Sequence, residues 1–179
     1  ELAQKVMRTI LPSVDVVIAN EEDCHDVLGI QAGKTDVHAG TLDTSRYPEV
    51  ARQVVAQFPN VRKVAITLRE SHSASHNNWG AMLYDTSDDK ASFAPLDANG
   101  DYRSYEIKNI VDRVGGGDAF AGGLIYALTS QHLKDPQTAL DYAVAASCLK
   151  HSISGDCNYS TRSEVEALMR GAASGRVVR

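Results

Sequence analysis

Three consecutive glycines and an aspartate precede a predicted apolar helix, in the stretch DRVGGGDAFAGGLIYAL at residues 112–128. Glycine loses more backbone entropy on folding than any other residue, so such a run indicates that something must come close to the backbone. The N-terminus of a helix exposes unpaired amides at the positive end of its dipole, and glycines let a large anion reach them. Gly115, Gly116 and Gly117 therefore predict an anion cradle that leads into a helix from Asp118 onward.

The carboxylate of Asp118 is unexpected beside a bound anion, because like charges repel. Its presence suggests proton transfer, in which a base takes the proton from a hydroxyl that attacks a phosphoryl group. The alternative is that Asp118 caps the helix and that the glycines form a tight turn. The P-loop pattern does not fit, because Gly122 is followed by Gly123 and Leu124.

Strand-like and helix-like segments alternate along the chain. The segments with the pattern of strands are 14–19, 61–68, 81–85 and 102–107. Those with the pattern of helices are 1–11, 20–30, 48–58, the segment from 118, 136–152 and 161–171. Asn20 is a plausible N-cap, Pro48 stands at a helix start, and Thr161 with Glu164 predicts a capping box.

The remaining segments are predicted to be irregular. Residues 31–47 are polar and aperiodic, 71–80 are expected to form a polar turn, and an acidic turn is expected at 86–101. The tail at 172–179 is expected to be frayed. Because no internal repeat or linker is evident, we expect residues 1–179 to form one α/β unit with a mainly parallel sheet.

Composition excludes several classes of protein. The 179 residues are 43% hydrophobic and 23% charged, with a net charge of −5, which disfavours binding to nucleic acid or to an anionic membrane. No apolar run has the length of a membrane span, and no signal peptide is evident. Cys24, Cys148 and Cys157 fit no zinc or disulfide pattern, which favours a reducing, cytoplasmic setting. The chain begins with Glu1 inside a predicted helix, as expected for a piece of a longer protein.

The stretch at 112–128 resembles the second signature of the ribokinase-like carbohydrate kinases, whose usual form is Asp-Thr-x-Gly-Ala-Gly-Asp. Arg113, Val114 and the triple glycine are most similar to the 2-keto-3-deoxygluconate kinases of that family. The stretches ANEED, TLRESHSASHNNWGAMLYD and AASCLKHSISGDCN agree with the resemblance. Such kinases are much longer than this chain, so the resemblance covers only their C-terminal half.

The resemblance implies a partial ribokinase-like fold, with a mainly parallel sheet flanked by helices, and an ATP-dependent kinase reaction. The expected reaction converts 2-keto-3-deoxygluconate to its 6-phospho product, with Mg²⁺ and, as a further option, a monovalent cation. Asp118 matches the catalytic base of the family. Gly115, Gly116 and Gly117, with the amide of Asp118, match its anion hole.

The resemblance also assigns Asn20 and Asp23 to an Asn-x-x-Glu element that organises Mg²⁺ and phosphate through water, so no direct metal ligand is expected. Asp23 is shorter than the usual glutamate. An ordinary capped, acidic helix start is the alternative interpretation of these residues.

Other residues match positions that line the nucleotide in kinases of this family. The segment after the strand at 61–68 corresponds to the region that lines the nucleotide, although relatives often have glycines where this chain has none until Gly80. The small residues of the helix at 136–152 permit close approach of adenine or, alternatively, of another helix. The residues assigned to these positions are Thr67, Arg69, Ser71, Ser73, Ala145 and Cys148.

Two residues are candidates for contact with the sugar acid. Arg113 is a natural partner for its carboxylate, with a salt bridge to Asp112 as the alternative. Asp156 is a candidate for contact with substrate or a cation, with a role in a turn as the alternative. The histidines show no metal-binding spacing.

Two other functions remain open from sequence. The chain could be part of a ribokinase-like kinase for another sugar, of the fructose or ribose type. It could also be a non-catalytic nucleotide-binding fragment. The retained Asp118 favours an enzyme. The expected partners are a sugar acid and ATP, and a homo-oligomer is left open.

Overall fold

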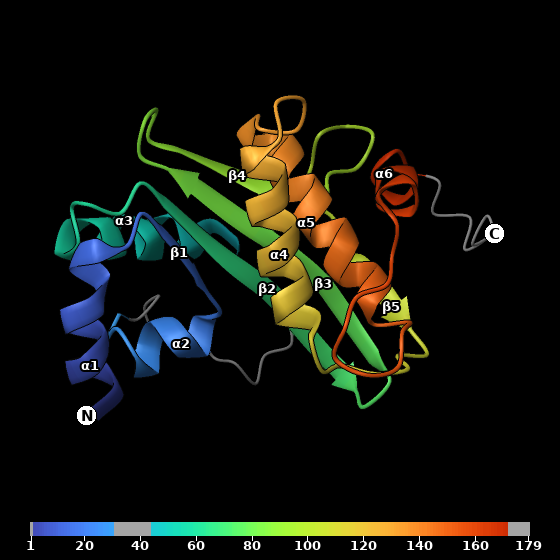
Figure 1. Ribbon diagram of the computed structural model, residues 1–179, viewed down its shortest axis with the longest axis horizontal. Helices are drawn as coiled ribbons and strands as arrows, with labels where there is room; N and C mark the ends of the chain where they lie inside the picture. Colours follow the sequence, from blue (N-terminus) through green and yellow to red (C-terminus); the bar gives the residue numbers. More distant parts are fainter. Residues whose placement is uncertain (1, 31–43, 172–179) are drawn as a thin grey trace. The chain divides into compact units, whose positions relative to one another are not determined.

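The computed structural model describes residues 2–30 and 44–171 (Figure 1). The chain divides into two compact units, which are described separately. Unit 1 comprises Glu1–Glu70 and Ala81–Ser92, and unit 2 comprises Ser71–Gly80 and Phe93–Arg179. Most of the irregular segment predicted at 31–47, and the whole of the tail predicted to be frayed, lie outside the described residues.

The strands form one mixed sheet. Its strands are β1 (Val16–Ala19), β2 (Lys63–Ser73), β3 (His76–Asp85), β4 (Lys90–Ala94) and β5 (Tyr105–Lys108). The order is β1-β2-β3-β4, and β5 also pairs with β3. β1 is parallel to β2, with Val16 opposite Lys63, whereas β5 is antiparallel to β3, with His76 opposite Lys108.

The sequence predicted a mainly parallel sheet, whereas the described part of the sheet is mixed. Strands joined by a two-residue turn must be antiparallel, since a parallel neighbour needs a long crossover, and β2 and β3 are separated by residues 74 and 75 alone. The polar turn predicted at 71–80 is wrong for the same reason: most of these residues continue β2 or begin β3. β4 was also missed inside the predicted acidic turn.

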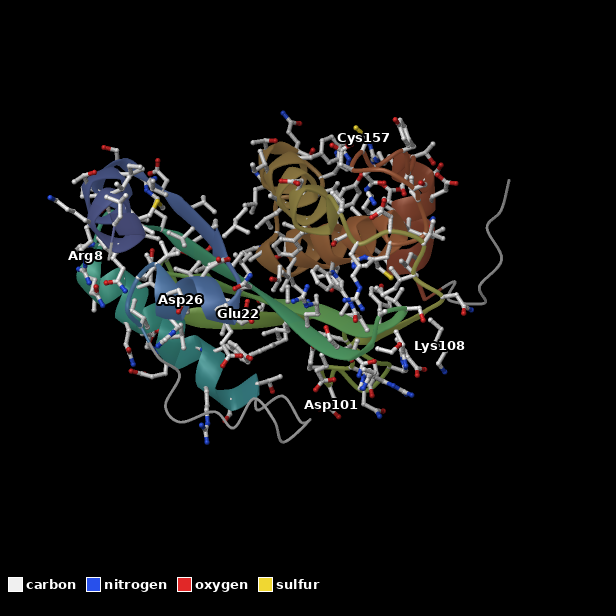
Figure 2. All side chains as sticks on the ribbon, turned by 90° about the horizontal axis from the view of Figure 1, so that it is seen from below. Arg8, Glu22, Asp26, Asp101, Lys108 and Cys157 are labelled. Carbon is white, nitrogen blue, oxygen red and sulfur yellow. The ribbon has the colours of Figure 1, made fainter. Side chains whose placement is uncertain are left out.

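Unit 1 contains the helices α1 (Leu2–Ile10), α2 (Glu21–Asp26) and α3 (Tyr47–Gln57), and the short 3₁₀ turns Leu11–Ser13 and Thr44–Arg46. The predicted N-cap at Asn20 is confirmed, and Pro48 lies in the first turn of α3. α1 is held to the end of α2, because Gln4 Nε2 donates to the carbonyl oxygen of Asp26 at 3.0 Å. Figure 2 labels Arg8 of α1, and Glu22 and Asp26 of α2.

Unit 2 contains α4 (Gly116–Thr129), α5 (Pro136–Lys150) and α6 (Arg162–Met169). α4 and α5 run side by side (Figure 1), and a Cβ added to Gly123 would lie 3.1 Å from Ala143 Cα. Glycine at this position therefore permits the close approach of the two helices. The capping box predicted at Thr161 and Glu164 is confirmed at the start of α6. The buried apolar side chains between these elements include Phe120, Leu124, Ala127, Leu140 and Val144.

No helix within residues 2–30 and 44–171 is both long enough and apolar enough to cross a membrane.

Candidate phosphate-binding site at the start of α4

The glycine run forms the N-cap and the first turn of α4. The helix begins at Gly116, two residues earlier than predicted, and Gly115 is its N-cap with a φ of 78°. No side chain of a described residue caps this end of the helix. A positive φ strongly favours glycine, so Gly115 is required by its backbone conformation. Gly116, Gly117 and Asp118 then occupy the first turn, where helix amides lack intrahelical partners.

The three glycines have different surroundings. A Cβ added to Gly115 would overlap the carbonyl oxygen of Asp156 and lie 2.7 Å from its carbonyl carbon. A Cβ added to Gly116 would lie 3.1 Å from His151 Cε1, whereas one added to Gly117 would have no described atom within 4 Å. Gly115 and Gly116 thus serve close packing, and Gly117 is the glycine that borders open space.

The backbone amides of the cradle also differ, because one of them has a hydrogen-bond acceptor within the described part of the chain and two do not. The Gly116 amide donates to the carbonyl oxygen of Arg113 at 3.3 Å, and the first helical bond runs from the Ala119 amide to the Gly115 carbonyl at 2.8 Å. Among the described residues, the amides of Gly117 and Asp118 have no acceptor. Two adjacent free amides at the positive end of a 14-residue helix suit the oxygens of a phosphate group.

Asp118 is exposed at the third position of α4. Within the described part of the chain, its carboxylate has neither a hydrogen bond nor an ion pair. It therefore does not cap the helix, because an N-cap side chain lies outside the first turn and accepts from an amide within it. The carboxylate remains available to a ligand beside the two free amides.

Two residues behind the cradle were missed in the sequence analysis. Ser147 and His151 lie four residues apart at the end of α5, and both are buried. Ser147 Oγ donates to the carbonyl oxygen of Gly116 at 2.7 Å, and His151 Nδ1 donates to the carbonyl oxygen of Ser147 at 2.8 Å. Their four-residue spacing on one helix face was the only sequence signal that could have identified the pair.

Asp112 holds the loop that contacts Gly115. Its carboxylate accepts from the Val114 amide at 3.0 Å and from the Gly155 amide at 2.9 Å. These backbone hydrogen bonds, the one from Val114 first, lower the pKa of Asp112. The side chain thereby connects the segment before the cradle to the loop that carries Asp156. The exposed Asp156 carboxylate accepts a 3.5 Å hydrogen bond from Cys157 Sγ.

Arg113 connects the start of the cradle to the β2–β3 hairpin. Its Nη2 donates to the carbonyl oxygen of Ser73 and, at 3.1 Å, to Asn77 Oδ1. The salt bridge to Asp112 considered as an alternative does not occur. Arg113 is itself exposed, so its other N–H groups can still reach a ligand.

In unit 1, Asn20 and Asp23 form a reciprocal capping box. Asn20 Oδ1 accepts from the Asp23 amide at 2.7 Å, and Asp23 Oδ2 accepts from the Asn20 amide at 3.1 Å. Both side chains are exposed and already serve the start of α2. No group of three or more His, Cys, Asp or Glu side chains in the described residues could hold a metal ion.

The other residues assigned to the nucleotide lie on β2 and α5. Thr67, Arg69, Ser71 and Ser73 belong to β2 itself rather than to a segment after it. Ala145 is fully buried in α5, whereas Cys148 is partly buried. Burial raises the pKa of the Cys148 thiol to about 12. The close contact of α4 and α5 accounts for small residues on this helix.

Comparison with known proteins agrees with this arrangement. Residues 80–162 match the model of the pfkB family of carbohydrate kinases. The 2-dehydro-3-deoxygalactonokinase of Haloferax volcanii is 26% identical over 173 residues, which are 97% of this chain and 43% of that protein. The crystal structure of a 2-dehydro-3-deoxygluconokinase from Thermotoga maritima is 41% identical, with a TM-score of 0.78 over 95% of this chain and 46% of that one.

A fructokinase from Vibrio cholerae, solved with fructose, ADP and potassium, shares the fold at 23% identity and a TM-score of 0.60. The match covers 94% of this chain and 44% of the fructokinase. The predicted resemblance to the pfkB carbohydrate kinases is thus confirmed, and the chain has part of the ribokinase-like α/β fold. It spans less than half the length of these relatives.

Proposed function

We propose that the chain supplies the phosphate-binding and proton-abstracting part of an ATP-dependent kinase for 2-keto-3-deoxygluconate. The observation that carries the proposal is the unpartnered carboxylate of Asp118 beside the free amides at the start of α4. In this role Asp118 takes the proton of the sugar hydroxyl as its oxygen attacks the γ-phosphorus. The new O–P bond forms as the bond to ADP breaks.

The cradle stabilises the transferred group in this scheme. The amides of Gly117 and Asp118 donate to the phosphoryl oxygens, and the dipole of α4 favours their negative charge. Gly115 sets the direction of the first turn, and Gly116 lets the turn pack against His151. The open space at Gly117 admits the phosphate.

The remaining assignments follow the family resemblance. The free N–H groups of Arg113 would bind the carboxylate of the sugar acid, and Asp156 lies beside the cradle. Asn20 and Asp23 each give one side-chain oxygen to the capping box, and the family resemblance assigns their contacts with magnesium to bridging water. The residues proposed for the nucleotide and its magnesium are Asn20, Asp23, Thr67, Arg69, Ser71, Ser73, Ala145 and Cys148.

The names of two relatives support the proposed substrate. The Thermotoga protein is named a 2-dehydro-3-deoxygluconokinase at 41% identity, and the Haloferax protein is named for the galactonate epimer at 26%. The higher identity favours the gluconate form, and the galactonate form is the second candidate. Comparing kcat/KM for the two epimers decides between them.

Replacing Asp118 by Asn tests the proposed base. The substitution removes proton acceptance but keeps the shape, so ATP binding should persist while kcat falls by roughly 10²–10⁴-fold. Turnover is measured by coupled ADP release in a chimera that adds the part of the Thermotoga maritima kinase which this chain does not cover. ATP binding is measured by calorimetry on the chimera.

The matched control is Asp101→Asn, which changes an exposed acid of unit 2 that has no proposed role in the site and is labelled in Figure 2. The control should keep the kcat of the unsubstituted chimera. Near-normal turnover in the Asp118→Asn chimera would remove Asp118 from the role of base.

A further inference from the structure

In the peptide group between Gly116 and Gly117, the carbonyl oxygen accepts a hydrogen bond, whereas the N–H has no acceptor among the described residues. This carbonyl oxygen accepts a buried 2.7 Å hydrogen bond from Ser147 Oγ. The N–H is the Gly117 amide. In a planar trans peptide these two groups point in opposite directions. A hydrogen bond that fixes the carbonyl therefore also fixes the direction of the Gly117 amide.

Ser147 is itself held in place. Its side chain is fully buried, so its hydroxyl has no access to bulk water. Serine in a helix commonly donates to the carbonyl four residues earlier, but this hydroxyl donates instead to a different helix. The carbonyl of Ser147 accepts from His151 Nδ1, and the His151 ring lies against Gly116. Ser147 and His151 thus hold the cradle from behind.

We propose that Ser147 is a positioning residue for the anion cradle, acting through the Gly116–Gly117 peptide. Donation to the carbonyl polarises the peptide, and hydrogen bonds in such a chain strengthen one another. The Gly117 amide becomes a better donor to phosphate without any contact between Ser147 and the ligand. The importance of this effect for phosphoryl transfer rests on the function proposed above, whereas the polarisation itself does not.

The test uses the chain labelled with ¹⁵N at its 13 glycines. Removing the hydroxyl with Ser147→Ala should move the Gly117 amide proton upfield in the absence of any ligand. The resonance is identified by its loss in Gly117→Ala. The control is Ser152→Ala, which removes an exposed hydroxyl in the turn after α5 that donates, within the described residues, to the carbonyl oxygen of Leu149. Ser147→Cys keeps a weaker donor and should shift the Gly117 amide proton by an intermediate amount. This variant replaces Ser147→Ala in the test if the alanine variant does not fold.

Titration with ATP and MgCl₂ gives the second readout. Loss of one polarising hydrogen bond should weaken binding at Gly117 by about threefold to tenfold in Ser147→Ala, with an unchanged affinity in Ser152→Ala. Equal Gly117 shifts in the two alanine variants would overturn the proposal. If ATP leaves the Gly117 amide of the unsubstituted chain unmoved, the phosphate-site function fails, while the ligand-free shift still decides the role of Ser147.

Discussion

Gly115, Gly116 and Gly117 are adjacent in sequence but have separate structural reasons to be glycine. Gly115 has a positive φ and contacts the backbone of Asp156, and Gly116 packs on His151. Gly117 borders open space on the side of the free amides. The packing of the fold therefore depends on the first two glycines, and we expect ligand binding to depend on the third.

Alanine substitutions should separate these roles. Gly115→Ala introduces a Cβ that overlaps the Asp156 carbonyl at a strained φ, and should destabilise the fold by about 1–3 kcal/mol. Gly117→Ala should instead stabilise the ligand-free chain by about 0.5–1 kcal/mol, because alanine loses less entropy in a helix. The same added methyl should weaken ATP binding, because it occupies the space proposed for phosphate.

Thermal melts and ATP titrations of both variants check this prediction. A Gly117→Ala chain that is stabilised and yet binds ATP normally would place the phosphate elsewhere. A Gly115→Ala chain with unchanged stability would contradict the packing at Asp156.

The cysteines should differ in reactivity. Burial, followed by the nearby Asp23 and Glu21 carboxylates, raises the pKa of Cys24 to about 12, and burial raises that of Cys148 to about 12. Thiolate is the reactive form, so both should resist alkylation. The exposed Cys157, labelled in Figure 2, should react first. Mass spectrometry after brief iodoacetamide treatment at pH 8 should find a single adduct, at Cys157, and an adduct at Cys24 would contradict its burial.

Local sequence was enough to predict the cradle and to single out Asp118, because a glycine run before an apolar helix is recognisable without knowledge of the fold. It could not show which glycine has the positive φ. Nor could it show that folding brings the backbone of Asp156 against Gly115 from a distant part of the sequence. Ser147 was missed for the same reason, since its partner is the backbone of another helix.

At the scale of elements, α5 packs an acid among buried residues. Asp141 accepts from Gln137 Nε2 at 3.1 Å, and that amide also donates to the Phe93 carbonyl at 2.8 Å. Burial is the main reason that the pKa of Asp141 rises to about 6. The folded chain thus takes up a proton between about pH 4 and pH 6 that the unfolded chain does not.

This shift predicts how stability changes with pH. Because the folded-state pKa is raised, the Asp141 contribution to stability is present at low pH and is lost as the pH rises through about 6. Asp141→Asn should raise the Tm at pH 7 by about 3 °C, the change that about 1 kcal/mol produces in a domain of this size. It should also flatten the Tm profile between about pH 4 and pH 6, where the folded and unfolded chains differ in proton uptake.

Calorimetric melts across this pH range, with Asp101→Asn as an exposed control, measure the effect. If the slope of Tm against pH is unchanged in Asp141→Asn, a titrating group other than Asp141 causes that slope.

The β2–β3 hairpin shows where element prediction from sequence failed. Residues 71–80 are rich in Ser, His and Asn, which are typical of turns. In the structure His76–Trp79 pair with β5, and Asn77 is buried with Arg113 as its partner. Long-range pairing overrides local preference here. The helices were predicted more closely, because N-caps and capping boxes are local signals.

At the scale of the whole molecule, α1 presents an uncovered apolar stripe. Leu2, Val6 and Ile10 share one face of the helix and are 76%, 45% and 47% exposed. Contiguous exposed apolar surface promotes association. We expect light scattering by the 179-residue chain to rise with concentration, and Val6→Ser with Ile10→Ser to reduce that rise. The control is Tyr159→Ser, which removes an isolated exposed ring.

The same chain should show no measurable kinase turnover with 2-keto-3-deoxygluconate, although it should bind ATP weakly. Phosphoryl transfer requires both reactants to be held in line, and the chain spans under half the length of its relatives. Coupled ADP release on the chain and on the chimera tests this directly. Robust turnover by a monodisperse monomer would show that the chain itself binds both substrates.

Trp79 is the chain's sole tryptophan, and its buried ring lies 5.1 Å from the ring of His151, which packs on Gly116. All indole fluorescence therefore comes from one place behind the cradle, and unit 1 contributes none. Exposure of the ring to water would shift the emission to longer wavelength, whereas circular dichroism sums over both units. Melting curves from the two signals coincide only if the units unfold together. The molecule thus carries an optical reporter of one unit that needs no added label.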